Sequence, residues 1–146
     1  MSEARTHILI VEARFYADLA DETAAGAIAT LEDAGVSHER IAVPGTFEIP
    51  AAIALAAKSG QFDGFVALGC VIRGQTTHYD YICQESARAL QDLATVNGLA
   101  IGYGILTCEN RDQAWVRADR DQGNKGRAAA EACLAMVALR RRFATP

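Results

Sequence analysis

One short stretch of the sequence, Gly69–Tyr81, combines residue types suited to proton transfer and to anion binding. His78 can accept and release protons near neutral pH. Gly74 and the hydroxyls of Thr76 and Thr77 offer backbone and side-chain donors that suit an anion such as phosphate. The stretch therefore predicts a proton acceptor and a phosphate site in a single turn.

The residues on either side predict that this turn joins a strand to a helix, the place where α/β proteins bind ligands. The apolar run Phe65–Leu68 is too short for a helix and predicts a buried strand. After the turn, apolar residues recur at helical spacing, at Ile82, Ser86/Ala87, Leu90 and Leu93/Ala94. Thr77 and Asp80 have the capping-box spacing, which places His78 in the first turn of that helix. The positive end of a helix favours the neutral, proton-accepting imidazole.

Each candidate residue also has a simpler interpretation. A single His at a helix start, such as His78, is more often a capping or surface residue than a catalyst. Phe15 is either part of the core or an aromatic platform for a planar ligand. Glu48 either complements a helix dipole or accepts hydrogen bonds from a polyol. The glycines on either side of Tyr103 suggest close approach of another backbone or a ligand, and Tyr103 is either a packed aromatic or a pocket wall.

The composition is that of a globular protein with one core. The chain has 146 residues, of which 51% are hydrophobic and 22% charged. Its net charge of −4 argues against a nucleic-acid partner, because phosphate backbones require clustered cations. The basic cluster Arg140–Arg142 is expected at a helix C-terminus, where cations complement the dipole.

No targeting segment, membrane partner or metal site is expected, and the expected location is the cytoplasm. The apolar run Ile8–Val11 is too short for a signal peptide, and no stretch approaches the roughly 20 apolar residues of a membrane span. His78 and Cys83 lack a usual metal-ligand spacing. The cysteines form no C-x-x-C pair and are expected to be reduced thiols: Cys70, Cys83, Cys108 and Cys133.

Short apolar runs alternate with helical patterns along the chain. Strands are predicted at 8–11, 40–43, 65–68 and 99–106, and helices at about 18–34, 51–59, 78–97 and 125–143, with a short helix around 115–117. The expected inward faces of the first and last helices include Ala34, Met136 and Leu139. Without a linker or repeat, residues 1–146 are expected to form a single α/β domain, a three-layer α/β/α sandwich with a four-stranded parallel sheet, flavodoxin-like. Alanine-rich helix faces predict a homo-oligomer.

Three blocks, in this order and spacing, resemble the lumazine synthase family: Val43–Pro50, Gly69–Tyr81 and Gly123–Gly126. The resemblance extends from Ile8 to the last helix. It implies the penultimate step of riboflavin biosynthesis, in which 5-amino-6-(D-ribitylamino)uracil condenses with 3,4-dihydroxy-2-butanone 4-phosphate. The implied products are 6,7-dimethyl-8-ribityllumazine, phosphate and water, formed without a cofactor or metal.

The resemblance also implies roles for single residues. His78 would transfer protons, Phe15 would stack on the pyrimidine, and Glu48 would accept hydrogen bonds from the ribityl hydroxyls. The implied contacts to the pyrimidine and its ribityl chain are Phe15, Thr46, Phe47, Glu48, Cys70, Val71 and Ile72.

For the phosphate, the resemblance implies donors from Gln75 and Thr76 and neutralisation by Arg117. Tyr103, Arg117 and Lys125 would come from a neighbouring subunit, because family members form pentamers, sometimes twelve of them in a hollow shell. Two departures stand out. Tyr16 replaces the common Asn, and the acidic segment 119–122 replaces small and basic residues, which favours a free pentamer.

Three other functions are weighed against this one. A lumazine- or flavin-binding or shell-forming relative without turnover would not need both His78 and Arg117. The related enzyme that dismutates two lumazines would not need a phosphate site at Gln75 and Thr76. A flavodoxin-like electron carrier would have a hydroxyl-rich phosphate loop where this chain has Glu12–Phe15.

Overall fold

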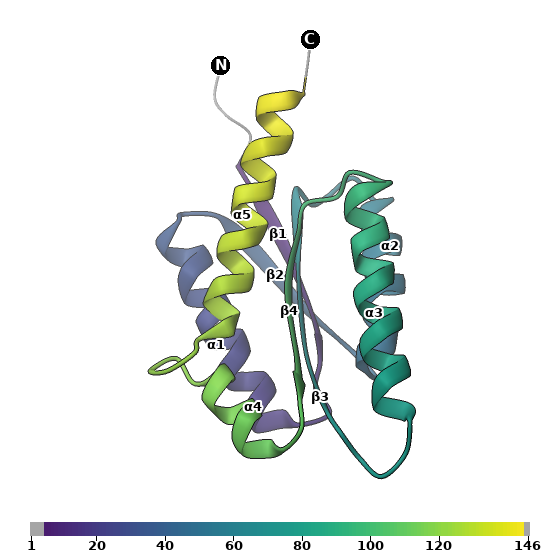
Figure 1. Ribbon diagram of the computed structural model, residues 1–146. Coiled ribbons are helices and arrows are strands. Elements are labelled where there is room, and N and C mark those ends of the chain that lie inside the picture. Colours follow the sequence, from purple (N-terminus) through teal and green to yellow (C-terminus); the bar gives the residue numbers. More distant parts are fainter. Residues whose placement is uncertain (1–4, 145–146) are drawn as a thin grey trace.

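The computed structural model describes residues 5–144 and contains a four-stranded sheet with helices on both faces (Figure 1). In chain order the elements are β1 (His7–Ala13), α1 (Ala17–Asp33), β2 (Ser37–Val43), the 3₁₀ helix η1 (Thr46–Glu48), α2 (Ile49–Ala57), β3 (Gly64–Ile72), α3 (His78–Thr95), β4 (Ile101–Cys108), α4 (Arg111–Ala118) and α5 (Lys125–Phe143). The strand order is β2-β1-β3-β4, and every pairing is parallel. The predicted three-layer α/β/α, flavodoxin-like fold is confirmed. Residues 1–4 and 145–146 of the predicted domain lie outside the described residues.

The two central strands, β1 and β3, supply side chains to both layers of helices. Because successive strand residues point to opposite faces, Ile8 and Leu68 pack with α1 and α5, whereas Leu9 and Phe65 pack with α2 and α3. Helices α1, α4 and α5 lie on one side of the sheet in Figure 1, and α2 and α3 on the other. Burial of both faces explains why β1 and β3 are almost continuously apolar. In the described part of the chain, no helix is long and apolar enough to cross a membrane.

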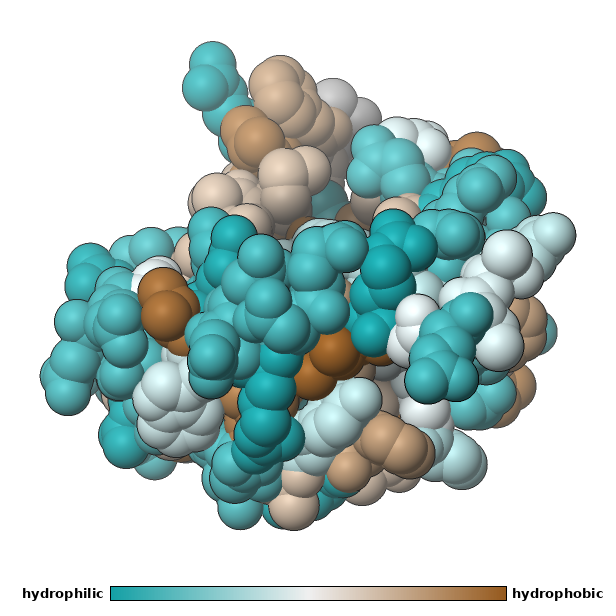
Figure 2. All heavy atoms as spheres, turned by 60° about the horizontal axis from the view of Figure 1, so that its bottom comes forward, coloured by the Kyte–Doolittle hydropathy of each residue, from teal (hydrophilic) through white to brown (hydrophobic). Residues whose placement is uncertain are grey.

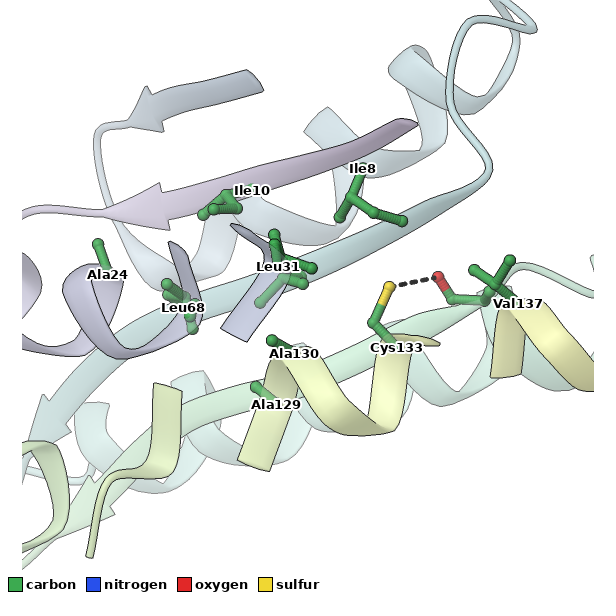
Figure 3. Packing of buried hydrophobic residues seen from close by; sticks show 12 residues of the cluster. Ile8, Ile10, Ala24, Leu31, Leu68, Ala129, Ala130, Cys133 and Val137 are labelled. Atoms are coloured by element: carbon green, nitrogen blue, oxygen red, sulfur yellow. Dashed lines mark hydrogen bonds between the residues drawn. The ribbon is translucent and has the colours of Figure 1, made fainter. Parts of the chain in front are cut away.

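Helix α5 contacts both β4 and α1 through backbone at positions that have no side chain. A Cβ atom built at Gly102 would lie 1.9 Å from the Ala129 carbonyl oxygen, and one at Gly126 would lie 1.9 Å from the Thr23 carbonyl oxygen. The predicted close approach of another backbone to β4 is therefore confirmed at Gly102. Figure 3 shows the adjoining core, where the Cys133 thiol of α5 donates to a carbonyl oxygen, that of Ala100, with an S···O distance of 3.9 Å.

Several predicted boundaries and core positions are wrong. Strand β3 continues to Ile72, through residues expected in the turn, because its pairing with β4 extends to Ile72 opposite Cys108. Ala34 follows the end of α1 and is exposed. On α5 the residues that face the sheet are small, and Met136 and Leu139 lie outside this buried stripe, 40% and 41% exposed.

The backbone contact at Gly102 yields a prediction about stability. Gly102→Ala should lower the free energy of unfolding by about 3 kcal/mol, because the new methyl group displaces the backbone of α5. Gly74→Ala is the matched control, since a Cβ there meets nothing within 4 Å. Urea unfolding at one fixed protein concentration measures both variants. Equal unfolding midpoints would show that α5 does not depend on this contact.

Candidate active site

A cavity of about 640 Å³ opens at the carboxyl ends of β1 and β3. Its walls come from the residues after β1, from η1, from the end of β3 and from the start of α3. The lining residues are Phe15, Tyr16, Gly45, Thr46, Phe47, Glu48, Cys70, Val71, Ile72, His78 and Ile82. Figure 2 shows this end of the molecule, where hydrophobic surface is open to solvent between hydrophilic side chains. The cavity thus brings together most of the residues predicted to bind substrate.

The backbone of β3 is open along one edge where it lines the cavity. Pairing with β1 ends at Leu68, opposite Glu12, whereas pairing with β4 continues to Ile72. Residues 69–72 therefore have a partner strand on one side only. Peptide N–H and C=O groups on the other side are placed for a planar ligand with its own donors and acceptors.

Phe15 presents an exposed ring at the cavity. Its side chain is 77% exposed, so the alternative that it belongs to the core is wrong. The ring of Tyr16 packs edge-to-face on it, with centroids 4.9 Å apart and an interplanar angle of 82°. The Arg111 guanidinium lies 5.8 Å from the Tyr16 ring centroid and pairs with Asp18, which holds the pKa of that carboxyl below its usual range. The ring of Tyr16 thus supports the orientation of the Phe15 ring.

Another part of the wall consists of η1 and the residue before it, Gly45. Thr46 is buried, and Phe47 is 55% exposed. Glu48 is the N-cap residue of α2, but its side chain makes no capping hydrogen bond. Its exposed carboxylate faces the cavity, where it is available to accept hydrogen bonds from hydroxyl groups.

His78 is the first residue of α3, as predicted, but the predicted capping box is wrong. Thr77 has helical backbone angles and its side chain makes no capping hydrogen bond. Instead the His78 N–H donates to the Thr76 hydroxyl, with an N···O distance of 3.3 Å. The Asp80 carboxylate, the expected partner in the box, pairs with Arg73 at 3.3 Å.

Cys70 lies on the open edge of β3 and is the cysteine that lines the cavity. Burial raises the pKa of its thiol to about 12. A thiol with that pKa carries almost no thiolate at pH 7, so it is no nucleophile there. In the described part of the chain no group of three or more His, Cys, Asp or Glu is arranged to hold a metal ion, and all four cysteines are free. His78 and Glu48 are cavity residues whose side chains can exchange protons.

The remaining predicted residues do not line this cavity. Gln75 and Thr76 lie exposed in the loop between β3 and α3. Tyr103, on β4, is 45% exposed, and burial of the rest of the ring raises its pKa. Arg117 lies on α4, across the sheet from α3, where it donates to the Gln113 carbonyl oxygen at 3.0 Å. Lys125 is the exposed first residue of α5.

Three lining residues were not predicted: Tyr16, Gly45 and Ile82. Each has a signal in the sequence. Tyr16 follows Phe15, Gly45 is within the block Val43–Pro50, and Ile82 is four residues after His78 and so on the same side of α3.

Comparison with known proteins identifies related sequences over nearly the whole chain. The family model described as 6,7-dimethyl-8-ribityllumazine synthase matches residues 5–141. A 6,7-dimethyl-8-ribityllumazine synthase of Bartonella bacilliformis is 56% identical over 139 residues, covering 94% of this chain and 91% of the relative. The protein of the same name from Sphingopyxis alaskensis is 56% identical over 137 residues, covering 94% and 96%. A 6,7-dimethyl-8-ribityllumazine synthase 1 of Rhizobium meliloti is 56% identical over 142 residues, covering 94% and 93%.

The raised pKa of Cys70 yields a prediction about alkylation. Because the thiolate is the reactive form, the rate for Cys70 in the folded protein should rise about tenfold per pH unit from pH 8 to pH 10 without levelling off. In guanidinium, where the pKa returns to about 8.5, the rate should level off near pH 9. Iodoacetamide labelling followed by peptide mass spectrometry measures both rates. A plateau near pH 9 in the folded protein would contradict the shift.

Proposed function

The chain belongs to the 6,7-dimethyl-8-ribityllumazine synthase family, and we propose how its residues perform the reaction of that family. It is a transferase of riboflavin biosynthesis that condenses 5-amino-6-(D-ribitylamino)uracil with 3,4-dihydroxy-2-butanone 4-phosphate. The observation that carries the assignment of residues is the single cavity that joins Phe15, the open edge of β3 and His78. Its volume of about 640 Å³ fits a small-molecule site.

The pyrimidine binds between Phe15 and the end of β3. Phe15 stacks on the ring, while backbone groups of Cys70, Val71 and Ile72 pair with the ring's polar edge. The ribityl chain extends along η1, where Thr46, Phe47 and Glu48 line its path. Glu48 accepts hydrogen bonds from the ribityl hydroxyls.

His78 transfers the protons of the condensation. The 5-amino group of the uracil attacks the ketone and forms an imine with loss of water, and phosphate is eliminated. The ribitylamino nitrogen then attacks the remaining carbonyl and closes the second ring with loss of another water. Each of these steps moves a proton, and an imidazole both accepts and donates near neutral pH. In this proposal the residues of the protein carry out the reaction, and no cofactor takes part.

The phosphate is held by the loop after β3 and by a neighbouring subunit. Gln75 and Thr76 supply donors from the loop. Arg117 neutralises the phosphate from the neighbour, together with Lys125 and Tyr103. The position of Arg117 on α4, across the sheet from the helix α3 that His78 begins, supports its supply by a neighbouring subunit.

The proposed assembly is a homopentamer in the cytoplasm. Exposed Trp115 and Val116, 40% and 45% exposed, adjoin Arg117 and offer apolar surface for subunit contact. In the acidic segment 119–122 the Asp119 carboxylate accepts from Gln122 and from the Asp121 N–H, both at 2.9 Å. Asp121 remains exposed, and its charge favours a free pentamer over a shell.

The decisive experiment mixes the purified protein with both substrates and records the absorbance of the lumazine product. The wild-type protein should form it, and His78→Ala should lower kcat by about 10²–10⁴-fold, because positioning survives while proton transfer is lost. The dependence of the rate on pH should differ between the wild-type protein and His78→Ala. If no product forms while a flavin binds tightly, the protein is a binding module.

A second prediction concerns the shared site. Arg117→Ala should raise KM for the phosphorylated ketone about 10- to 100-fold and leave the pyrimidine KM nearly unchanged. Co-assembly of equal amounts of His78→Ala and Arg117→Ala protomers should restore about one quarter of wild-type activity at low ketone concentration, since one interface in four combines both intact residues.

Arg127→Ala is the matched control, because Arg127 pairs with Glu131 on the exposed face of α5 at 3.2 Å. Its kinetics should equal those of the wild type. Absence of any recovery on co-assembly would refute a site built from two subunits, and an equal rise in both KM values would remove Arg117 from the phosphate site.

A further inference from the structure

Arg73, the first residue after β3, contacts two elements besides its own loop. Its Nε atom lies 3.0 and 3.1 Å from the two carboxylate oxygens of Glu109, which follows β4. Its Nη2 atom lies 3.3 Å from Asp80, and its guanidinium lies 4.4 Å from the ring centroid of Tyr79. Asp80 and Tyr79 belong to the first turn of α3. One side chain therefore links the end of β4 to the start of α3.

The Arg73 backbone and its main partner are themselves fixed. The Arg73 N–H donates to the Cys108 carbonyl oxygen at 2.9 Å, which extends the pairing of β3 and β4 by one step. The Glu109 N–H donates to the side chain of Gln113 at 2.8 Å, in the first turn of α4. Hydrogen bonds thus hold in place both the backbone of Arg73 and the backbone of Glu109, the carboxylate to which its guanidinium donates.

The loop that Arg73 begins has few other attachments. Residues 73–78 are exposed, and Thr77 provides no side-chain cap for α3. Within the loop the hydrogen bonds are local, from the His78 N–H to Thr76 and from the Asp80 N–H to Thr77. These bonds shape the turn but do not attach it to the sheet, and the side chain of Tyr79 adds a hydrogen bond to Thr107 of β4 beside the Arg73 link.

We propose that Arg73 is a positioning residue for the condensation, because it holds the loop 74–77 and the first turn of α3 against the end of β4. It thereby fixes the distance between the phosphate donors of the loop and the imidazole of His78. A guanidinium suits this role because its planar fork donates to two carboxylates while its face stacks on a ring, which an ammonium does not do. What the loop binds rests on the proposed function, but the attachment of the loop does not.

Exposed ion pairs contribute little to global stability, so the effect of Arg73 should appear in site geometry. Arg73→Gln and Glu109→Gln should each raise KM for the phosphorylated ketone and lower kcat, each by about tenfold, since small misplacements of reacting groups are costly. The pyrimidine KM and the melting temperature should stay close to wild type. The double variant should be no worse than either single variant, because both remove the same link.

Arg88→Gln is the matched control. Arg88 is an exposed arginine of α3, and it pairs with Glu85 and Asp92 of the same helix. It should leave all kinetic constants unchanged. Glu109→Gln separates positioning from direct contact with substrate. If Arg73 itself bound the phosphate, Arg73→Gln alone would be impaired and Glu109→Gln would match the control, which would overturn the proposal.

Amide hydrogen exchange tests the attachment without any assay of activity. Residues 74–81 should exchange faster in Arg73→Gln and Glu109→Gln, whereas residues 88–95 should be unaffected. Unchanged exchange at 74–81 in both variants would overturn the proposal even if activity fell. A wild-type protein that forms no lumazine but shows the exchange response would refute the proposed function and leave only the attachment of the loop by Arg73 supported. Glu109→Gln, at an exposed side chain, supplies the answer should Arg73→Gln fail to fold.

Discussion

The parallel backbone pairing of β3 with both of its neighbours is the constraint on which the site depends. At residues 65–68 β3 is paired with a strand on both edges and buried on both faces, so its position there is fixed. β1 stops pairing at Leu68, whereas β4 continues to Ile72. The difference of a few residues leaves a rigid but open edge. In the proposed function this edge binds the pyrimidine, and no loop has to become ordered for that contact.

The two faces of the sheet differ in how closely the helices pack on them. On one face, glycine and alanine bring α5 into backbone contact with β4 at Gly102 and with α1 at Gly126. Close packing of this kind resists displacement. On the other face, the start of α3 is linked to the end of β4 through Arg73 and through the hydrogen bond of Tyr79 to Thr107. The close packing of α5 supports the strands, and the start of α3 carries His78.

Much of the fold was predictable because both central strands are buried on both faces and therefore appear as apolar runs. The ends of these strands were not predictable, because the pairing that extends β3 to Ile72 involves backbone groups common to every residue type. The capping box was wrong for a different reason, since Asp80 has two possible partners and the sequence does not show that Arg73 lies within reach. Met136 and Leu139 have the hydrophobicity of core residues, but small residues of α5 already fill the space against β4.

For the site, the sequence motifs predicted the residues of the cavity wall from Phe15 to His78. Arg117 was predicted for the same site, but within a single chain it does not line the cavity.

The open edge of β3 affects how readily specificity changes. A ligand bound along residues 69–72 is recognised by peptide groups, which are the same whatever side chains those positions carry. Ordinary point mutations there alter the lining of the cavity and leave the pattern of donors and acceptors intact. Evolution toward a different heterocycle would thus require a shift of strand register or an inserted bulge, changes that arise far more rarely than single replacements.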